Sequence, residues 1–141
     1  MRGQHSGVVS LPEFGRLAEI AVPAGSSAPG AARQVVAHCL ARLVASRIVD
    51  ETQLLASELV TNSVCHGDLD ERDSVLVRIY LAAESLRVEI ENSGAAGVVA
   101  LNRPDLQAGR GFGLQLLELV ATRWGVARGQ STTVWFEMAR A

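Results

Sequence analysis

The most informative part of this 141-residue sequence is the stretch Glu58-Leu59-Val60-Thr61-Asn62-Ser63-Val64-Cys65-His66. Glu58, Asn62 and His66 follow one another at intervals of four, so on a helix they share one face. Spacing alone leaves two interpretations open. The face is either solvated, or it is a polar wall where a carboxylate positions a nucleophile and an amide oxygen binds a hard cation such as Mg²⁺.

A glycine cluster, Gly109-Arg110-Gly111-Phe112-Gly113-Leu114, stands at the start of a further expected helix. Glycine lets the backbone approach an anion closely, and a helix N-terminus offers free N–H groups and a favourable dipole. This is phosphate-binding chemistry, although flexible turns also use glycine clusters. The cluster does not follow a strand directly and lacks a Gly-Lys-Ser/Thr ending, which argues against a dinucleotide fold and a P-loop.

A third group, Glu91-Asn92-Ser93-Gly94, ends an expected strand. A short polar side chain followed by glycine is compatible with a simple turn. It is equally compatible with a side chain presented to a base edge at the mouth of a pocket.

The flanking sequence predicts the elements around these groups. Alternating apolar residues predict strands over residues 17–22, 75–80, 86–91, 124–127 and 132–138. Helical spacing predicts helices from Pro29 to about Leu43, from an N-cap at Asp50 to His66, and over about 111–122. In these helices the expected buried residues include Leu54, Leu114, Leu117, Leu119 and Val120.

Hairpin-connected strands with segregated helices indicate an α+β fold. We expect a two-layer sandwich of a mixed, mostly antiparallel sheet, covered on one face by about three helices. Residues 1–16 are expected to be a flexible segment and residues 17–141 a single domain. Residues 92–110 have little apolar periodicity, which predicts a long functional loop.

Composition excludes several classes of protein. The net charge of -2 gives no basic field for direct nucleic-acid binding. No apolar run is long enough to span a bilayer and Met1 to Ser10 lack a signal core, so we expect a cytoplasmic protein without membrane contact. Cys39 and Cys65 are far apart and predict two reduced thiols on helices, not a disulfide or a zinc site.

Taken together and in this order, the three groups resemble the GHKL superfamily of histidine-kinase-like ATPases. The likeness is to its anti-sigma-factor serine/threonine kinase branch, of the actinobacterial type. Glu58-x-x-x-Asn62-x-x-x-His66 is similar to the N box, Asn92-x-Gly94 occupies the first glycine box, and Gly109-x-Gly111-x-Gly113-Leu114 is similar to the second. Residues 123–126 and 133–137 are similar to the last strands of the branch, and the resemblance covers residues 17–138.

This resemblance implies a regulator that binds ATP and Mg²⁺, phosphorylates a serine or threonine of an antagonist (anti-anti-sigma) protein and sequesters a sigma factor. It also allows a homodimer. It makes Glu58 the general base and Asn62 the Mg²⁺ ligand, and we expect both to line one cavity with His66, Gly111 and Gly113. The remaining nucleotide contacts that it implies are Asn92, Gly94, Gly109, Arg110, Phe112, Leu114 and Thr133, beneath a lid of residues 95–108.

One position departs from the family, which normally has Asp where this chain has Asn92. The family's carboxylate accepts a hydrogen bond from the adenine amino group, and an amide oxygen accepts it without the assistance of charge. We expect a loss of roughly 1–2 kcal/mol, or about tenfold in affinity. In addition, Ala96 replaces a usual glycine, with Gly97 shifted by one.

Two other functions are compatible with the same fold. The first is a degenerate ATPase-fold module that regulates its partner by contact without catalysis. The second is the ATPase core of a sensor histidine kinase. We rank that one last, because no helix pair with a phosphoacceptor histidine stands upstream of residue 17.

Overall fold

The computed structural model describes residues 13–66, 69, 72–92 and 113–141. Within them it has five strands and three helices. Their order is β1 (Gly15–Pro23), α1 (Ala28–Leu40), α2 (Ser46–His66), β2 (Ser74–Leu81), β3 (Ser85–Asn92), α3 (Gly113–Val120), β4 (Arg123–Arg128) and β5 (Thr132–Ala139). The α+β class is confirmed.

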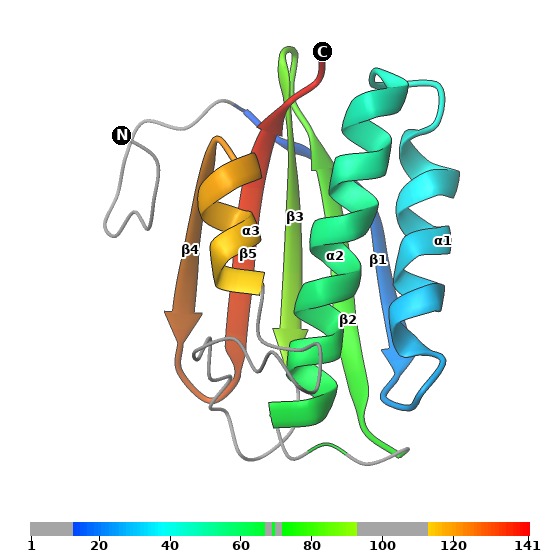
Figure 1. The fold of residues 1–141 in the computed structure, drawn as a ribbon, viewed down its shortest axis with the longest axis vertical. Coiled ribbons are helices and arrows are strands. Elements are labelled where there is room, and N and C mark those ends of the chain that lie inside the picture. Colours follow the sequence, from blue (N-terminus) through cyan, green and yellow to red (C-terminus); the bar gives the residue numbers. More distant parts are fainter. Residues whose placement is uncertain (1–12, 67–68, 70–71, 93–112) are drawn as a thin grey trace.

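The five strands form one sheet in the order β1-β2-β3-β5-β4. All four pairings between these strands are antiparallel. The three helices lie on one face of the sheet, α1 toward β1, α2 across the middle and α3 toward β4 (Figure 1). The expected two-layer sandwich is therefore confirmed.

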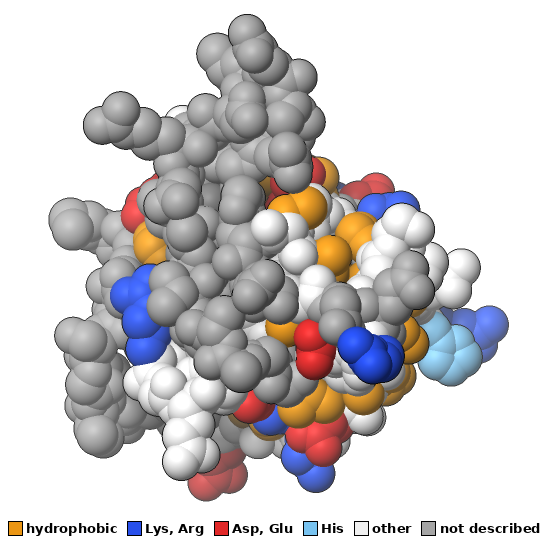
Figure 2. Space-filling view, turned by 90° about the horizontal axis from the view of Figure 1, so that it is seen from below, with side chains coloured by type: hydrophobic (Ala, Val, Ile, Leu, Met, Phe, Trp, Pro, Cys, Tyr) orange, Lys and Arg blue, Asp and Glu red, His pale blue; other side chains and the backbone are white. Residues whose placement is uncertain are grey.

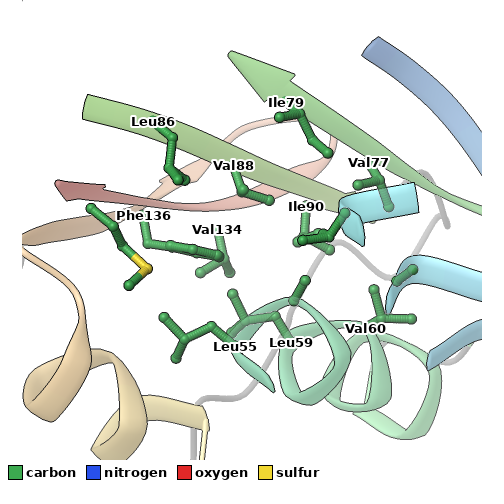
Figure 3. Packing of buried hydrophobic residues seen from close by; sticks show 14 of the residues in the cluster. Leu55, Leu59, Val60, Val77, Ile79, Leu86, Val88, Ile90, Val134 and Phe136 are labelled. Atoms are coloured by element: carbon green, nitrogen blue, oxygen red, sulfur yellow. The ribbon is translucent and has the colours of Figure 1, made fainter. Parts of the chain in front are cut away.

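Period-two alternation along the strands explains the core. Val75, Val77 and Ile79 of β2 point toward the helices and are fully buried. Figure 3 shows Leu55, Leu59 and Val60 of α2 packed against the inward residues of β2, β3 and β5. Burying a side chain of this size contributes about 1.5–3 kcal/mol, so this layer fixes α2 on the sheet.

The intervening residues form the other, polar face of the sheet. Arg78 donates to Glu19, Glu89 and Glu91, and Arg87 donates to Glu89 and Glu137. The Trp135 ring lies on this face, with the Arg87 guanidinium 4.2 Å from its centroid, whereas Trp124 lies in the core. Both tryptophans therefore serve packing.

The start of α2 corrects the sequence analysis. The helix begins at Ser46, not at an Asp50 N-cap, because the Ala45 carbonyl already accepts hydrogen bonds from Ile48 and Val49. Both of these residues are buried, so their packing extends the helix by one turn.

Three leucines that the spacing assigns to apolar faces are exposed. Leu43 lies beyond the end of α1 and is 40% exposed, and Leu54 on α2 is 45% exposed. Leu119 on α3 is 70% exposed, whereas Leu117 is fully buried. Residues two positions apart point in directions that differ by about 200° around a helix axis. The eight-residue α3 therefore cannot bury both Leu117 and Leu119.

Both cysteines are free thiols on helices, as predicted, with Cys39 half-buried and Cys65 exposed. Among the described helices, none is long and apolar enough to cross a membrane. β1 begins at Gly15, inside the segment expected to be flexible, and residues 1–12 lie outside the described residues. The expected lid over residues 95–108 lies outside them too.

Candidate functional site

The C-terminal half of α2 carries the first polar group. Asn62 is only 6% exposed and Glu58, one turn earlier, is half-buried. A solvated helix face would leave Asn62 open to water, so its burial favours the polar wall over the solvated face. His66 is the last residue of α2, and its side chain lies outside the described residues.

The start of α3 lies against the apolar side of α2. A Cβ placed on Gly113 would meet the Leu59 side chain at 3.5 Å, so the first residue of α3 touches α2 beside Glu58. The first turn of α3 carries no acidic side chain, so its positive dipole end is not neutralised. Gly109, Arg110, Gly111 and Phe112 lie outside the described residues, as does the side chain of Leu114.

The end of β3 supplies the next group. Asn92 is the last residue of the strand and is fully buried. Its register partner on β5 is Thr132, which is also fully buried. Both alternate in phase with Ile90 and Val134, so they face the helices. Gly94 lies outside the described residues.

Thr133, assigned to the nucleotide by resemblance, lies on the opposite face of the sheet from Asn92. It pairs with Glu91 and points to the polar face, because successive side chains of a strand alternate. The neighbouring Thr132 instead shares the face of Asn92. Thr132 alternates in phase with the apolar residues Val134 and Phe136, and this pattern could have predicted from the sequence that Thr132 faces the helices.

Glu91 is held from two sides on the polar face. The Ser131 hydroxyl, in the turn between β4 and β5, donates to its carboxylate at 2.7 Å, and Arg78 of β2 donates to the other oxygen. The Ser131 hydrogen bond, followed by that from Arg78, lowers the pKa of the Glu91 carboxyl from its ordinary value. Glu91 is therefore a carboxylate at neutral pH.

The polar groups converge at one end of the molecule. The C-terminal half of α2, the end of β3 and the start of β5 lie toward this end, and α3 begins on the side that faces it (Figure 1). Seen from this end, acidic and basic side chains are interspersed on the described surface (Figure 2). This surface has no basic field of the kind that recognises nucleic acid.

The donor set limits the kind of metal that this end can bind. No group of three or more His, Cys, Asp or Glu residues gathers in the described part of the chain. An amide oxygen on Asn62 and a carboxylate on Glu58 suit a hard cation that takes its other ligands from phosphate and water, as Mg²⁺ does.

A cavity of about 410 Å³ lies elsewhere, between β1 and α1. Its lining is mainly apolar and includes Ile20, Val22, Val35 and Cys39. We do not assign it to the nucleotide, because it contains none of the polar residues that converge beside Asn62.

Comparison with known proteins adds two findings. Residues 22–138 match the family model described as a histidine kinase-like ATPase domain. The crystal structure of the RsbU and RsbW domains of Rv1364c from Mycobacterium tuberculosis is similar, with a TM-score of 0.67 and 19% identity. The match covers 88% of this chain but only 33% of that one, and at this identity it shows a shared fold. A search of curated proteins finds no match.

Proposed function

Because this chain belongs to the histidine kinase-like ATPase domain family, we propose that it is an ATP-dependent serine/threonine protein kinase of the anti-sigma-factor type. One juxtaposition carries the proposal: Gly113, at the start of α3, packs on Leu59 between Glu58 and Asn62 of α2. This contact supports a phosphate site at the N-terminus of α3, near the turns of α2 that carry the Glu58 carboxylate and the Asn62 amide.

The base of ATP is proposed to bind at the ends of β3 and β5. Asn92 offers an amide oxygen to the adenine amino group, and Thr132 faces the same side from the neighbouring strand. The phosphates then lie toward the start of α3, whose backbone N–H groups point along the helix axis.

Asn62 and Glu58 fit a hard cation, since both offer oxygen ligands from successive turns of one helix face. Asn62 is the residue proposed to hold Mg²⁺. A bound Mg²⁺ neutralises charge that develops on the phosphate oxygens during transfer.

Glu58 is proposed as the general base. Its carboxylate accepts the proton of the attacking serine or threonine hydroxyl as the oxygen bonds to the γ-phosphorus and ADP leaves. Glu58 is half-buried, so a hydroxyl of a docked partner can reach it from solvent.

The proposed partners are a sigma factor and an antagonist protein that carries the acceptor hydroxyl. The printed name of the solved neighbour includes an RsbW domain, and the motifs of this chain resemble the anti-sigma-factor branch. The proposal includes a cytoplasmic location, where ATP is available, and a possible pairing with a second copy of the chain.

Asn92 favours a second candidate function. A neutral amide at the adenine position weakens nucleotide recognition, and this suits a module that regulates its partner by contact alone.

Transfer of labelled γ-phosphate from ATP–Mg²⁺ to proteins in a lysate of the source cells separates these functions. The wild type should label a protein on serine or threonine, and Glu58→Gln should not. Glu51→Gln, on the same helix and paired with Arg47 at 3.1 Å, is the matched control and should behave as wild type. ATP binding without any labelled product would leave the contact-only regulator as the function.

A further inference from the structure

On the basis of the proposed nucleotide site, we infer that Glu91 and Ser131 are positioning residues that hold Asn92 and Thr132 in place from the opposite face of the sheet. The hydrogen bond from Ser131 to Glu91 joins the β4–β5 turn to the end of β3. Each of its two partners directly precedes a residue of the proposed base-binding pair.

The position of the bond explains why it matters. Asn92 is the last residue of β3, and Thr132 is the first of β5. Strand ends open more easily than strand centres, because the paired strand continues from them in one direction only. A hydrogen bond across these two ends holds Asn92 and Thr132 in register, at the point where the nucleotide is proposed to bind.

Arg78 strengthens the same end from the other neighbour. It lies on β2, donates to Glu91, and is itself held by Glu19 of β1 at 2.7 Å. Arg78 on β2 and Ser131 in the β4–β5 turn thus bind Glu91 from both sides of β3. The end of β3 is therefore anchored on either side by charge-assisted hydrogen bonds, which are about twice as strong as neutral ones.

Glu91 itself cannot contact a nucleotide held by Asn92. Successive residues of a strand point to opposite faces, so its carboxylate lies on the polar face, away from the helices. Any effect of Glu91 on nucleotide affinity must therefore pass through the backbone of Asn92 and Thr132.

Glu89 provides a matched control in the same strand. Its side chain is 19% exposed against 20% for Glu91, it lies on the same face, and it also accepts from Arg78. It lies one pleat away from the strand end and has no bond to the β4–β5 turn among the described contacts. Removing it disturbs the same ion-pair network without releasing Asn92.

The test measures dissociation constants for ATP–Mg²⁺ and GTP–Mg²⁺ well below the melting temperature of each variant. Glu91→Ala and Ser131→Ala should each weaken ATP binding by about fivefold, as expected for one lost hydrogen bond. Both should also lower the ratio of the GTP dissociation constant to the ATP dissociation constant. The reason is that only the contacts that recognise the base are displaced. Glu89→Ala should keep the wild-type values, and Ser131→Thr, which retains the hydroxyl, should restore them.

Each other outcome has a separate meaning. If wild type binds ATP and the variants at Glu91 and Ser131 match Glu89→Ala, the positioning role is wrong and the proposed function stands. If the binding of ATP and the binding of GTP weaken equally, Glu91 has only a structural role and does not position the contacts to the base. If wild type fails to bind either nucleotide, the proposed function and the positioning role fall together.

Discussion

Asn92 and Thr132 lie directly opposite each other where β3 pairs with β5, and neither side chain is exposed. Their shared face is the one covered by the helices, at the end where α2 presents Asn62 and Glu58. Two polar residues buried side by side at the ends of strands are unusual in a core of valine, isoleucine and leucine. In the proposed function, this pair lies where the base of ATP binds.

The substitution Asn92→Asp should tighten ATP binding by several-fold, on the order of 1 kcal/mol, because a carboxylate is a stronger acceptor for the adenine amino group. Since Asn92 is fully buried, the same change should lower the melting temperature without nucleotide. Calorimetric titration and thermal melting measure the two effects. Weaker ATP binding would show that Asn92 donates to the base, and GTP would then be the nucleotide to test.

The pH dependence of stability should reveal the charge on Glu91. Because its folded-state pKa is lowered, the carboxylate stabilises the fold above its ordinary pKa of 4.5. That contribution is lost as the pH falls through the lower folded-state value. Glu91→Gln should therefore be less stable than wild type at pH 7, and urea unfolding should show the difference shrinking as the pH falls below 4.5. A difference that is constant with pH would exclude the charge as its cause.

Gly125 should resist substitution because of Trp135. A Cβ at this position would lie 2.7 Å from the Trp135 ring, closer than real Cβ atoms approach other groups. Gly125→Ala should destabilise the protein by about 1–3 kcal/mol, as overpacking does. In a Trp135→Leu background the same substitution should have a much smaller effect. Equal losses of unfolding free energy in the two backgrounds would show that the ring is not the obstacle.

Arg140 should stabilise the end of the molecule opposite the site. Its guanidinium donates to the Leu43 carbonyl at 2.8 Å and to the Ala82 carbonyl at 3.0 Å, which joins the α1–α2 connection to the β2–β3 turn. Arg140→Ala should lower the unfolding free energy by about 1–2 kcal/mol and leave nucleotide affinity unchanged. Arg140→Lys should recover only part of the lost unfolding free energy, since lysine lacks the several fixed N–H donors of a guanidinium. Exposed Arg42→Ala is the control.

The fold could be predicted largely from the sequence, because period-two alternation and helical spacing are local signals. The clearest case is β3, where Leu86, Val88 and Ile90 are buried and the residues between them are charged. Helix limits were less predictable. Burial of Ile48 and Val49 extends α2 back to Ser46, and such packing is a tertiary effect that an expected N-cap at Asp50 does not reveal.

The arrangement of the candidate site was predictable where spacing on one element determines it. Glu58 and Asn62 share a face because they are four residues apart, and this follows from helix geometry. The face on which Thr133 lies could not be predicted from the motif, because that face depends on the register of β5 against β3. The contact of Gly113 with Leu59 joins residues 54 positions apart, and no local pattern predicts such a pairing.

Calorimetric titration of ATP–Mg²⁺ into the purified protein tests the central claim most directly. The account predicts saturable binding to one site per chain, weakened by Asn62→Ala and strengthened by Asn92→Asp. An absence of binding at millimolar ATP in both the wild type and Asn92→Asp would contradict it.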